Sequence, residues 1–185
     1  MENRSVCVFC SSDDNVAETL KLCTQEIGSF LGTKGLRVLT GGSEAGLMWS
    51  IAEGFLKTGH LDKFKMIIPE VFRNKADKQH SGLTKENIQW SDSFRTQLIQ
   101  FETEARNFII MPGGYGTMLE FFHLLNKKKF DKDSDIKIIL FNFNGFWDHL
   151  VNQFDFMVTE NTLTEDHRNL FHIAKVADDL HDILG

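Results

Sequence analysis

The sequence predicts an α/β fold in which a parallel sheet carries helices on both faces. The first observation behind this prediction is alternation. Short apolar runs that suit buried strands are separated by longer stretches whose apolar residues recur at helical spacing. Such alternation is typical of a doubly wound, Rossmann-like sheet. The second observation is that glycine-rich turns follow two of the strands, where ligands bind in such folds. Because 185 residues are the length of one domain, we expect residues 1–185 to form a single domain.

The first half of the chain is expected to form three strands and two helices. Gly32 and Gly35 end the first helical pattern, Gly59 ends the second, and Pro69 ends the third strand. In order, the expected elements are a strand at residues 6–10, a helix at 17–31, a strand at 36–40, a helix at 47–56, a strand at 65–68 and a loop-rich polar segment at 70–82.

The second half continues the alternation and places its most glycine-rich turn directly after a strand. The expected elements are a short strand at residues 88–90, a helix at 94–106, a strand at 108–111, a helix at 116–129, a strand at 137–141, a helix at 146–158, a short strand at 170–174 and a terminal helix at 177–184. The carboxyl ends of parallel strands share one edge of a sheet. The loops at residues 11–14, 41–46 and 113–117 are therefore expected to meet there.

Composition excludes several classes of protein. The formal net charge of −6 argues against binding nucleic acid through a broad basic surface. No apolar run approaches the ~20 residues that a membrane span needs, so we expect no membrane segment. The first five residues lead straight into a strand rather than into the apolar segment of a signal peptide.

Three cysteines, an odd number, do not suit a disulfide framework. Cys7 and Cys10 lie three positions apart on the first expected strand, so their side chains should point to opposite faces of the sheet. We therefore expect buried, reduced thiols that share no metal, and a cytoplasmic protein.

The most informative segment is Met-Pro-Gly-Gly-Tyr-Gly-Thr-Met-Leu-Glu at residues 111–120. It reads as the end of a strand, a glycine-rich turn and the start of a helix. Backbone N–H groups and the helix dipole can bind an anion at such a turn. A carboxylate at Glu120, about one turn on from Gly116, would repel a bound phosphate. Glu120 is therefore expected to act on another part of the ligand. The alternative is a plain turn in which Glu120 only complements the helix dipole.

Other ligand classes fit less well. After the first strand the chain has Ser-Ser-Asp-Asp at residues 11–14 instead of the dinucleotide-binding glycines. The glycines at positions 41, 42 and 46 have a different spacing, and a Walker-type Gly-Lys-Thr is absent. The seven histidines show no metal-ligand spacing. We expect neither a cofactor nor a metal.

Three segments resemble the LOG family of nucleoside 5′-monophosphate phosphoribohydrolases, whose members are often labelled lysine decarboxylases. Residues 111–120 are similar to the family signature Pro-Gly-Gly-x-Gly-Thr-x-x-Glu. Leu-Thr-Gly-Gly-Ser-Glu-Ala-Gly-Leu-Met at residues 39–48 looks like its Gly-Gly-Gly-x-x-Gly-Leu-Met-Gly, with Ser43 and Trp49 replacing two glycines. Residues 6–12 resemble its Val-Cys-Val-Phe-Cys-Gly-Ser-Ser opening. The resemblance covers nearly the whole chain.

The resemblance implies a nucleotide-binding homodimer that hydrolyses the N-glycosidic bond of a nucleoside 5′-monophosphate, AMP or a cytokinin riboside monophosphate. Breaking this bond builds positive charge on the ribose, which a carboxylate stabilises. Glu120 is the expected catalytic carboxylate. The residues expected to bind substrate are Gly113, Gly114, Gly116, Thr117, Gly41, Gly42 and Ser12.

The family's arginine is displaced in this chain. Gln97 stands at its position, and Arg95 stands where the family has a histidine. Arg95 is expected to serve as the second catalytic residue if the backbone shifts locally, and is otherwise a surface charge. Gln97 can still donate a hydrogen bond to a base or phosphate. The alternative function is therefore a nucleotide or phosphoribosyl binding module that has lost catalysis.

Overall fold

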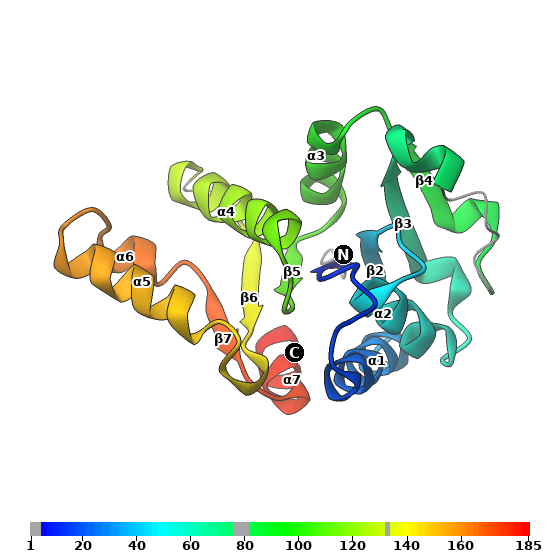
Figure 1. Ribbon diagram of the computed structural model, residues 1–185, viewed down its shortest axis with the longest axis horizontal. Helices are drawn as coiled ribbons and strands as arrows, with labels where there is room; N and C mark the ends of the chain where they lie inside the picture. Colours follow the sequence, from blue (N-terminus) through cyan, green and yellow to red (C-terminus); the bar gives the residue numbers. More distant parts are fainter. Residues whose placement is uncertain (1–4, 76–81, 132–133) are drawn as a thin grey trace.

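The computed structural model describes residues 5–75, 82–131 and 134–185. Its helices and strands follow one another around a central sheet (Figure 1). They are β1 Ser5–Phe9, α1 Glu18–Thr33, β2 Arg37–Gly41, α2 Gly46–Leu56, β3 Phe64–Pro69, β4 Ile88–Ser91, α3 Phe94–Glu104, β5 Asn107–Ile110, α4 Tyr115–Phe130, β6 Lys137–Phe141, α5 Asp148–Thr159, α6 Glu165–Arg168, β7 His172–Ala174 and α7 Ala177–Leu184.

The described residues form one sheet of seven parallel strands, in the order β4-β3-β2-β1-β5-β6-β7. From β1 the chain winds outward to β4 on one side. It then returns to β5 on the other side of β1. The strand order therefore reverses between β1 and β5, and the crevice beyond their carboxyl ends is the usual ligand site of such sheets.

Each face of the sheet has its own apolar core. Val6, Val8 and Cys10 of the first strand and its following loop pack with α1, α2 and α7. Cys7 and Phe9 pack on the other face with α3, α4 and α5. The predicted doubly wound, Rossmann-like sheet is confirmed, and so is the prediction that Cys7 and Cys10 lie on opposite faces.

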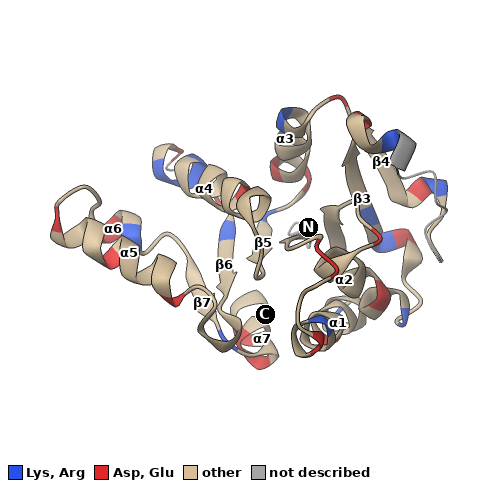
Figure 2. Ribbon diagram, in the orientation of Figure 1, with Lys and Arg blue, Asp and Glu red and all other residues tan. Residues whose placement is uncertain are grey.

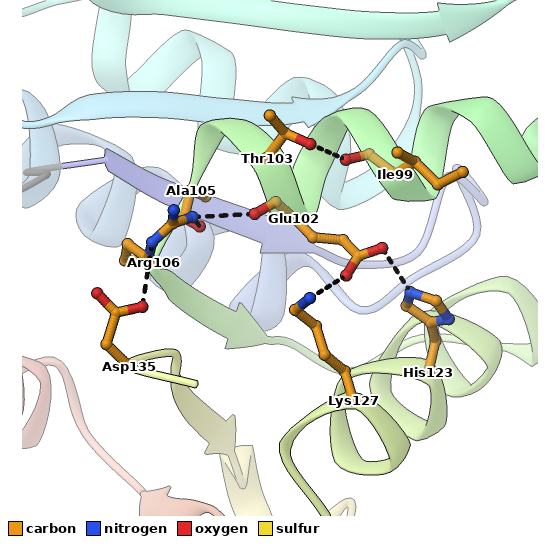
Figure 3. Close-up of polar contacts among 8 residues, drawn as sticks. All are labelled: Ile99, Glu102, Thr103, Ala105, Arg106, His123, Lys127 and Asp135. Carbon is orange, nitrogen blue, oxygen red and sulfur yellow. Dashed lines mark hydrogen bonds and ion pairs between the residues drawn. The ribbon is translucent and has the colours of Figure 1, made fainter. Parts of the chain in front are cut away.

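Helix α3 is fixed to its neighbours by charge near its carboxyl end. The carboxylate of Glu102 contacts two basic side chains of α4 (Figure 3). Its oxygens lie 3.1 Å from Nε2 of His123 and 3.0 Å from Nζ of Lys127. Glu104 pairs with Arg37 of β2 and with Lys65 of β3. Helices α3 and α4 therefore lie side by side, and both begin at the carboxyl edge of the sheet and run away from it.

The expected elements all occur, with shifted ends. The predicted helix at 146–158 begins at Asp148 because a 3-10 turn at Phe143–Gly145, with Asn144 at φ 49°, precedes it. The four-residue α6 was not expected; Thr164 caps it by accepting a hydrogen bond from the N–H of His167. The segment predicted as a loop from 70 to 82 begins with the 3-10 helix Glu70–Lys75. The part of that prediction at residues 76–81 lies outside the described residues.

Candidate functional site

A cavity of about 550 Å³ opens at the carboxyl ends of β1, β2, β3 and β5. The loops after β1 and β5 meet there, since the N–H of Ser11 donates a hydrogen bond to the carbonyl oxygen of Pro112 at 3.1 Å. The volume suits a small-molecule ligand. The lining residues are Cys10, Ser11, Ser12, Asp13, Gly41, Gly42, Ser43, Glu44, Met48, Pro69, Phe72, Phe94, Gln97, Leu98, Gly114, Tyr115, Gly116, Thr117, Leu119 and Glu120.

The N-terminus of α4 faces this cavity with free donors. Its N-cap residue, Gly114, makes no side-chain cap. Within the described residues, the N–H groups of Gly114, Tyr115, Gly116 and Thr117 have no hydrogen-bond acceptor. Unsatisfied N–H groups at the positive end of a helix dipole form an anion site. This turn therefore has the geometry to hold a phosphate.

The glycines of this turn serve two purposes. A Cβ at Gly113 would lie 2.2 Å from Oγ1 of Thr117, so this position must be small for the buried Thr117 to pack. A Cβ at Gly114 or Gly116 would meet no protein atom within 4 Å. Glycine in the first turn of a helix lowers helix stability, and no internal contact requires it at Gly116. Gly114 is the N-cap residue, a position that glycine tolerates well. The bare backbone of both residues leaves room for a ligand. Gly113 itself does not line the cavity.

The loop at Gly41 and Gly42 leads into helix α2, whose first N–H groups are already hydrogen-bonded to other parts of the protein. The N–H of Gly46, at the start of α2, donates to Oδ1 of Asp14 at 2.9 Å. The N–H of Leu47 donates to the carbonyl oxygen of Ser11, also at 2.9 Å. Gly41 and Gly42 therefore line the cavity beside α2, but the N-terminus of α2 is already occupied by protein acceptors.

Glu120 lies on α4 one turn inside the cavity and is partly buried. Burial raises the pKa of Glu120 to about 8. The main cause is desolvation, which disfavours the charged carboxylate. A carboxyl group that titrates near neutral pH is suited to acid–base or charge-stabilising chemistry.

Cys10 also lines the cavity, but as an inert thiol. Desolvation and then the charge of Glu120 raise the pKa of Cys10 well above its ordinary value. A thiol held neutral is a poor nucleophile, so covalent catalysis through Cys10 is disfavoured.

The two candidate residues of α3 point in different directions. Gln97 is buried, lines the cavity and is hydrogen-bonded to the backbone of β3. Arg95 is exposed and lies outside the lining of the cavity in its own chain. Its catalytic role stays a prediction.

Several lining residues were not predicted. Part of the lining is apolar and is formed by Met48, Phe94 and Leu98, by Pro69 at the end of β3 and by Phe72 after that strand. Asp13 and Glu44 bring two further carboxylates. The end of β3 at Pro69, beside β2 in the sheet, was the signal that could have identified this wall. Trp49, which could have narrowed the pocket or filled the core, packs against the core.

Across residues 5–75, 82–131 and 134–185, no helix is both long and apolar enough to cross a membrane. In the same ranges, no three His, Cys, Asp or Glu side chains are grouped so that they could hold a metal ion.

Comparison with known proteins identifies the family. A family model described as "Possible lysine decarboxylase" matches residues 48–184. The chain belongs to this family. Relatives of the chain are named cytokinin riboside 5′-monophosphate phosphoribohydrolases, and several of them carry the LOG name. The cytokinin riboside 5′-monophosphate phosphoribohydrolase of Rhodococcoides fascians is 27% identical over 172 residues, 93% of this chain and 84% of that protein. The LOG5 enzyme of the same name from Arabidopsis thaliana is 25% identical over 177 residues, covering 96% of this chain and 75% of that protein. The predicted LOG-family membership is confirmed.

Solved structures agree on the fold. The protein TM1055 superposes with a TM-score of 0.68 at 18% identity, covering 97% of both chains. The molybdenum cofactor carrier protein of Chlamydomonas reinhardtii gives a TM-score of 0.66 at 15% identity, again over 97% of both chains. At these identities the likeness extends to the fold alone.

Proposed function

We propose that this LOG-family chain hydrolyses the N-glycosidic bond of a nucleoside 5′-monophosphate, AMP or a cytokinin riboside monophosphate. The products would be the free base and ribose 5-phosphate. One observation carries the proposal: Glu120, with a pKa near 8, shares a cavity with the open N-terminus of α4. The relatives named as phosphoribohydrolases support hydrolase activity of this kind.

The 5′-phosphate would be held by the N–H groups of Gly114, Tyr115, Gly116 and Thr117. Ser12, Gly41 and Gly42 lie across the same cavity and would face the rest of the substrate. The base would lie against the apolar wall that includes Met48 and Phe94. Phosphate binding would then position the reacting bond, although the phosphate itself does not react.

Glu120 would stabilise the positive charge that develops on the ribose as the bond to the base breaks. Binding of the substrate displaces bulk water from the cavity, which strengthens this interaction. One water molecule must remain to attack C1′ of the ribose: its hydroxyl group forms the new bond as the bond to the base breaks, and its proton balances the proton that the departing base takes up. The ionised form of Glu120 is the form needed, because a neutral carboxyl group offers no charge to an oxocarbenium-like state.

The test is incubation of the purified protein with a panel of nucleoside monophosphates, with chromatography of the products. We expect free base and ribose 5-phosphate from AMP or a cytokinin riboside monophosphate. Adenosine should be bound far more weakly than AMP, since charge-assisted hydrogen bonds to the phosphate contribute roughly 1.5–3 kcal/mol each. If calorimetry gave equal affinities for AMP and adenosine, the proposal that the start of α4 binds the 5′-phosphate would be wrong.

A second candidate is a nucleotide or phosphoribosyl binding module without catalysis. The observation that favours it is the position of Arg95 outside the cavity, with the neutral Gln97 inside. The fold is also shared by proteins named as molybdenum cofactor carriers. Binding of AMP without release of base would decide for this candidate.

We further propose that the protein is a homodimer. Phe94, Tyr115 and Leu119 line the cavity and are exposed large apolar residues, and Ile99 of α3 is exposed as well. Phe101 and Phe121 of the same two helices are buried in the core of the subunit and are not available for such a contact. Light scattering at micromolar concentration tests the dimer, and Ile99→Glu should weaken it.

Free thiols, two of them buried, fit a reducing compartment. We therefore propose that the reaction takes place in the cytoplasm, which localisation of a tagged protein would test.

A further inference from the structure

The side-chain amide of Gln97 has one orientation that its surroundings allow. Its Nε2 lies 2.6 Å from the carbonyl oxygen of Ile67 in β3. A carbonyl oxygen can only accept a hydrogen bond, so the nitrogen of the amide must face it. A Cβ at Gly41, at the end of β2, would lie 3.9 Å from the same nitrogen, so this side of the amide lies close to two strands. The oxygen Oε1 is therefore directed away from the carbonyl oxygen of Ile67.

Oε1 of Gln97 is an acceptor without a protein donor. Among the residues that the structure describes, the contact with Ile67 is the one hydrogen bond of this side chain. Gln97 lines the cavity and is 7% exposed, and Oε1 is not sealed off by protein. The surface that Gln97 keeps is therefore the surface of the cavity. A buried carbonyl oxygen costs free energy unless a donor reaches it, so a bound ligand should supply that donor.

The charges around the cavity leave this donor to the ligand. Asp13, Glu44 and Glu120 bring three carboxylates to the lining, and no lining residue in the described ranges is Lys, Arg or His. The loop between β1 and α1 also carries negative charge (Figure 2). An ionised carboxylate accepts hydrogen bonds and cannot donate them. Apart from the start of α4, which is assigned to the phosphate, the site therefore favours a ligand that is rich in hydrogen-bond donors.

Gln97 lies about level with Glu120 on the neighbouring helix. Glu102 of α3 contacts both His123 and Lys127 of α4, so position 102 lies beside the middle of that pair, position 125 (Figure 3). Both helices begin at the carboxyl edge of the sheet. Gln97 and Glu120 each precede these positions by five residues, so each lies about 7.5 Å closer to that edge. The two residues therefore line the cavity at about the same level.

In the proposed function, the part of the substrate at the level of Glu120 is the ribose. An ionised phosphate offers acceptor oxygens, and it is assigned to the N–H groups at the start of α4. The base is assigned to the apolar lining at Met48 and Phe94. The donors that remain are the ribose hydroxyl groups. Of these, the 2′-hydroxyl is on the carbon next to C1′, the reacting carbon that Glu120 would face.

Resting on the proposed function, we propose that Oε1 of Gln97 accepts a hydrogen bond from the 2′-hydroxyl of the substrate and makes the site selective for ribonucleotides over 2′-deoxyribonucleotides. Hydrogen bonds to this hydroxyl strengthen in the transition state of glycoside hydrolysis. An analogue without the hydroxyl leaves Oε1 unpaired, which is how sites built for a hydroxyl group reject such analogues. Arginine, which the family signature has at this position, carries donors and no acceptor. The contact therefore depends on the glutamine of this chain.

Calorimetry with matched nucleotides tests this contact. Wild-type protein should bind 2′-deoxy-AMP roughly ten- to a hundredfold more weakly than AMP, whereas 3′-deoxy-AMP should bind about as well as AMP. Gln97→Met keeps the length of the side chain without its polar atoms, so it should bind AMP and 2′-deoxy-AMP equally. Any loss of stability from the missing contact with Ile67 affects both nucleotides alike. Leu98→Ala, at the next position of α3, is the control: it changes the lining of the cavity but should keep the wild-type ratio of affinities.

Two results would overturn the proposal. The first is equal binding of AMP and 2′-deoxy-AMP by the wild-type protein. The second is a Gln97→Met variant that keeps the wild-type preference for AMP, because the preference would then come from another residue.

The same comparison separates this proposal from the proposed function. It measures binding and needs no turnover, and ribose 5-phosphate and 2-deoxyribose 5-phosphate extend it to ligands without a base. If the wild-type protein binds AMP without releasing adenine, the hydrolase proposal fails, while the ratio of the two affinities still decides the role of Gln97. If it releases adenine from AMP and binds both nucleotides equally, the hydrolysis reaction stands and the role proposed for Gln97 is wrong.

Discussion

Nε2 of Gln97 donates a hydrogen bond to the carbonyl oxygen of Ile67 at 2.6 Å, and this contact fixes the only α3 amide side chain that lines the cavity within the described residues. Gln97 is 7% exposed, so its amide lies at the inner wall rather than at the mouth. The position at which the LOG signature has an arginine is therefore directed at the cavity, but it holds a neutral group tied to β3.

Gln97→Arg should restore a cation at this wall. We expect AMP affinity to rise roughly tenfold or more, because a charged donor to phosphate contributes about 1.5–3 kcal/mol. Gln97→Met is the matched control, since both variants lose the amide that binds Ile67 and only one adds charge. Calorimetry with AMP compares them. If Gln97→Arg binds no better than Gln97→Met, the phosphate does not reach this wall.

Gly116→Ala should separate stability from binding. Alanine in place of glycine in the first turn of α4 should raise the free energy of unfolding by about 0.5–1 kcal/mol, since its Cβ meets no protein atom. The same methyl group should weaken AMP binding by crowding the phosphate. Asp14→Ala is the reciprocal control: it uncaps α2 and should cost about 0.5–2 kcal/mol of stability while leaving AMP affinity in place. Equal AMP affinity in wild type and Gly116→Ala would place the phosphate elsewhere.

Glu120→Gln should lose turnover by roughly 10²–10⁴-fold, as for other positioned carboxylates. The amide keeps the shape of the side chain but removes the charge that the ribose requires. Binding of AMP should survive near pH 7, where the wild-type carboxyl group is mostly neutral, and should improve above pH 8, where the wild-type carboxylate repels the phosphate. Product release and calorimetry measure the two effects. Unchanged turnover would reduce Glu120 to a helix-dipole complement, with a cost in stability of about 0.3–1 kcal/mol.

The sequence predicted the sheet because alternation and apolar runs are local properties, and both survive in the structure. It did not distinguish the two glycine loops. Both precede a helix, but of the two helices α2 is the one whose first N–H groups already have protein acceptors. One of these acceptors is Asp14, which binds the N–H of Gly46 although the two residues are 32 positions apart in the chain. The apolar wall at Pro69 and Phe72 was hidden for the same reason, since strand order decides that β3 lies near the site.

The helical period gave partial information about α3. Residues two apart on a helix point in different directions, so Gln97 and Arg95 could not both face the cavity. Which of them does so follows from how α3 packs, and that packing is set by Phe101 and Gln97 against the sheet side and by Glu102 against α4. These contacts join distant segments and leave no pattern in the sequence.

Glu102→Gln should loosen the link between α3 and α4 in a pH-dependent way (Figure 3). Burial opposes ionisation of Glu102, but hydrogen bonds from Lys127 and His123 outweigh it and hold its pKa below the ordinary value. A carboxyl group with a lowered pKa in the folded state stabilises the protein above its unfolded pKa, and this contribution is lost as pH falls through the folded pKa. We expect the variant to be less stable by roughly 1–3 kcal/mol at pH 7, and we expect this difference to shrink as the pH falls below the ordinary pKa of a glutamate. Urea unfolding across this pH range checks this; a constant difference would exclude an ionic origin.

The pH dependence of turnover should report the ionisation of Glu120. Its pKa near 8 means that about a tenth of the free protein carries the carboxylate at pH 7 and nearly all of it at pH 9. A role in stabilising positive charge requires the carboxylate, so kcat/KM should rise about tenfold from pH 7 to pH 9 and then level off. The phosphate of the substrate, with a second pKa of about 6, is already ionised across this range.

The residual activity of Glu120→Gln should lack this rise in kcat/KM between pH 7 and pH 9. A fall in kcat/KM above pH 8 would show instead that the protonated form is active. Glu120 would then donate a proton to the departing base rather than stabilise the ribose.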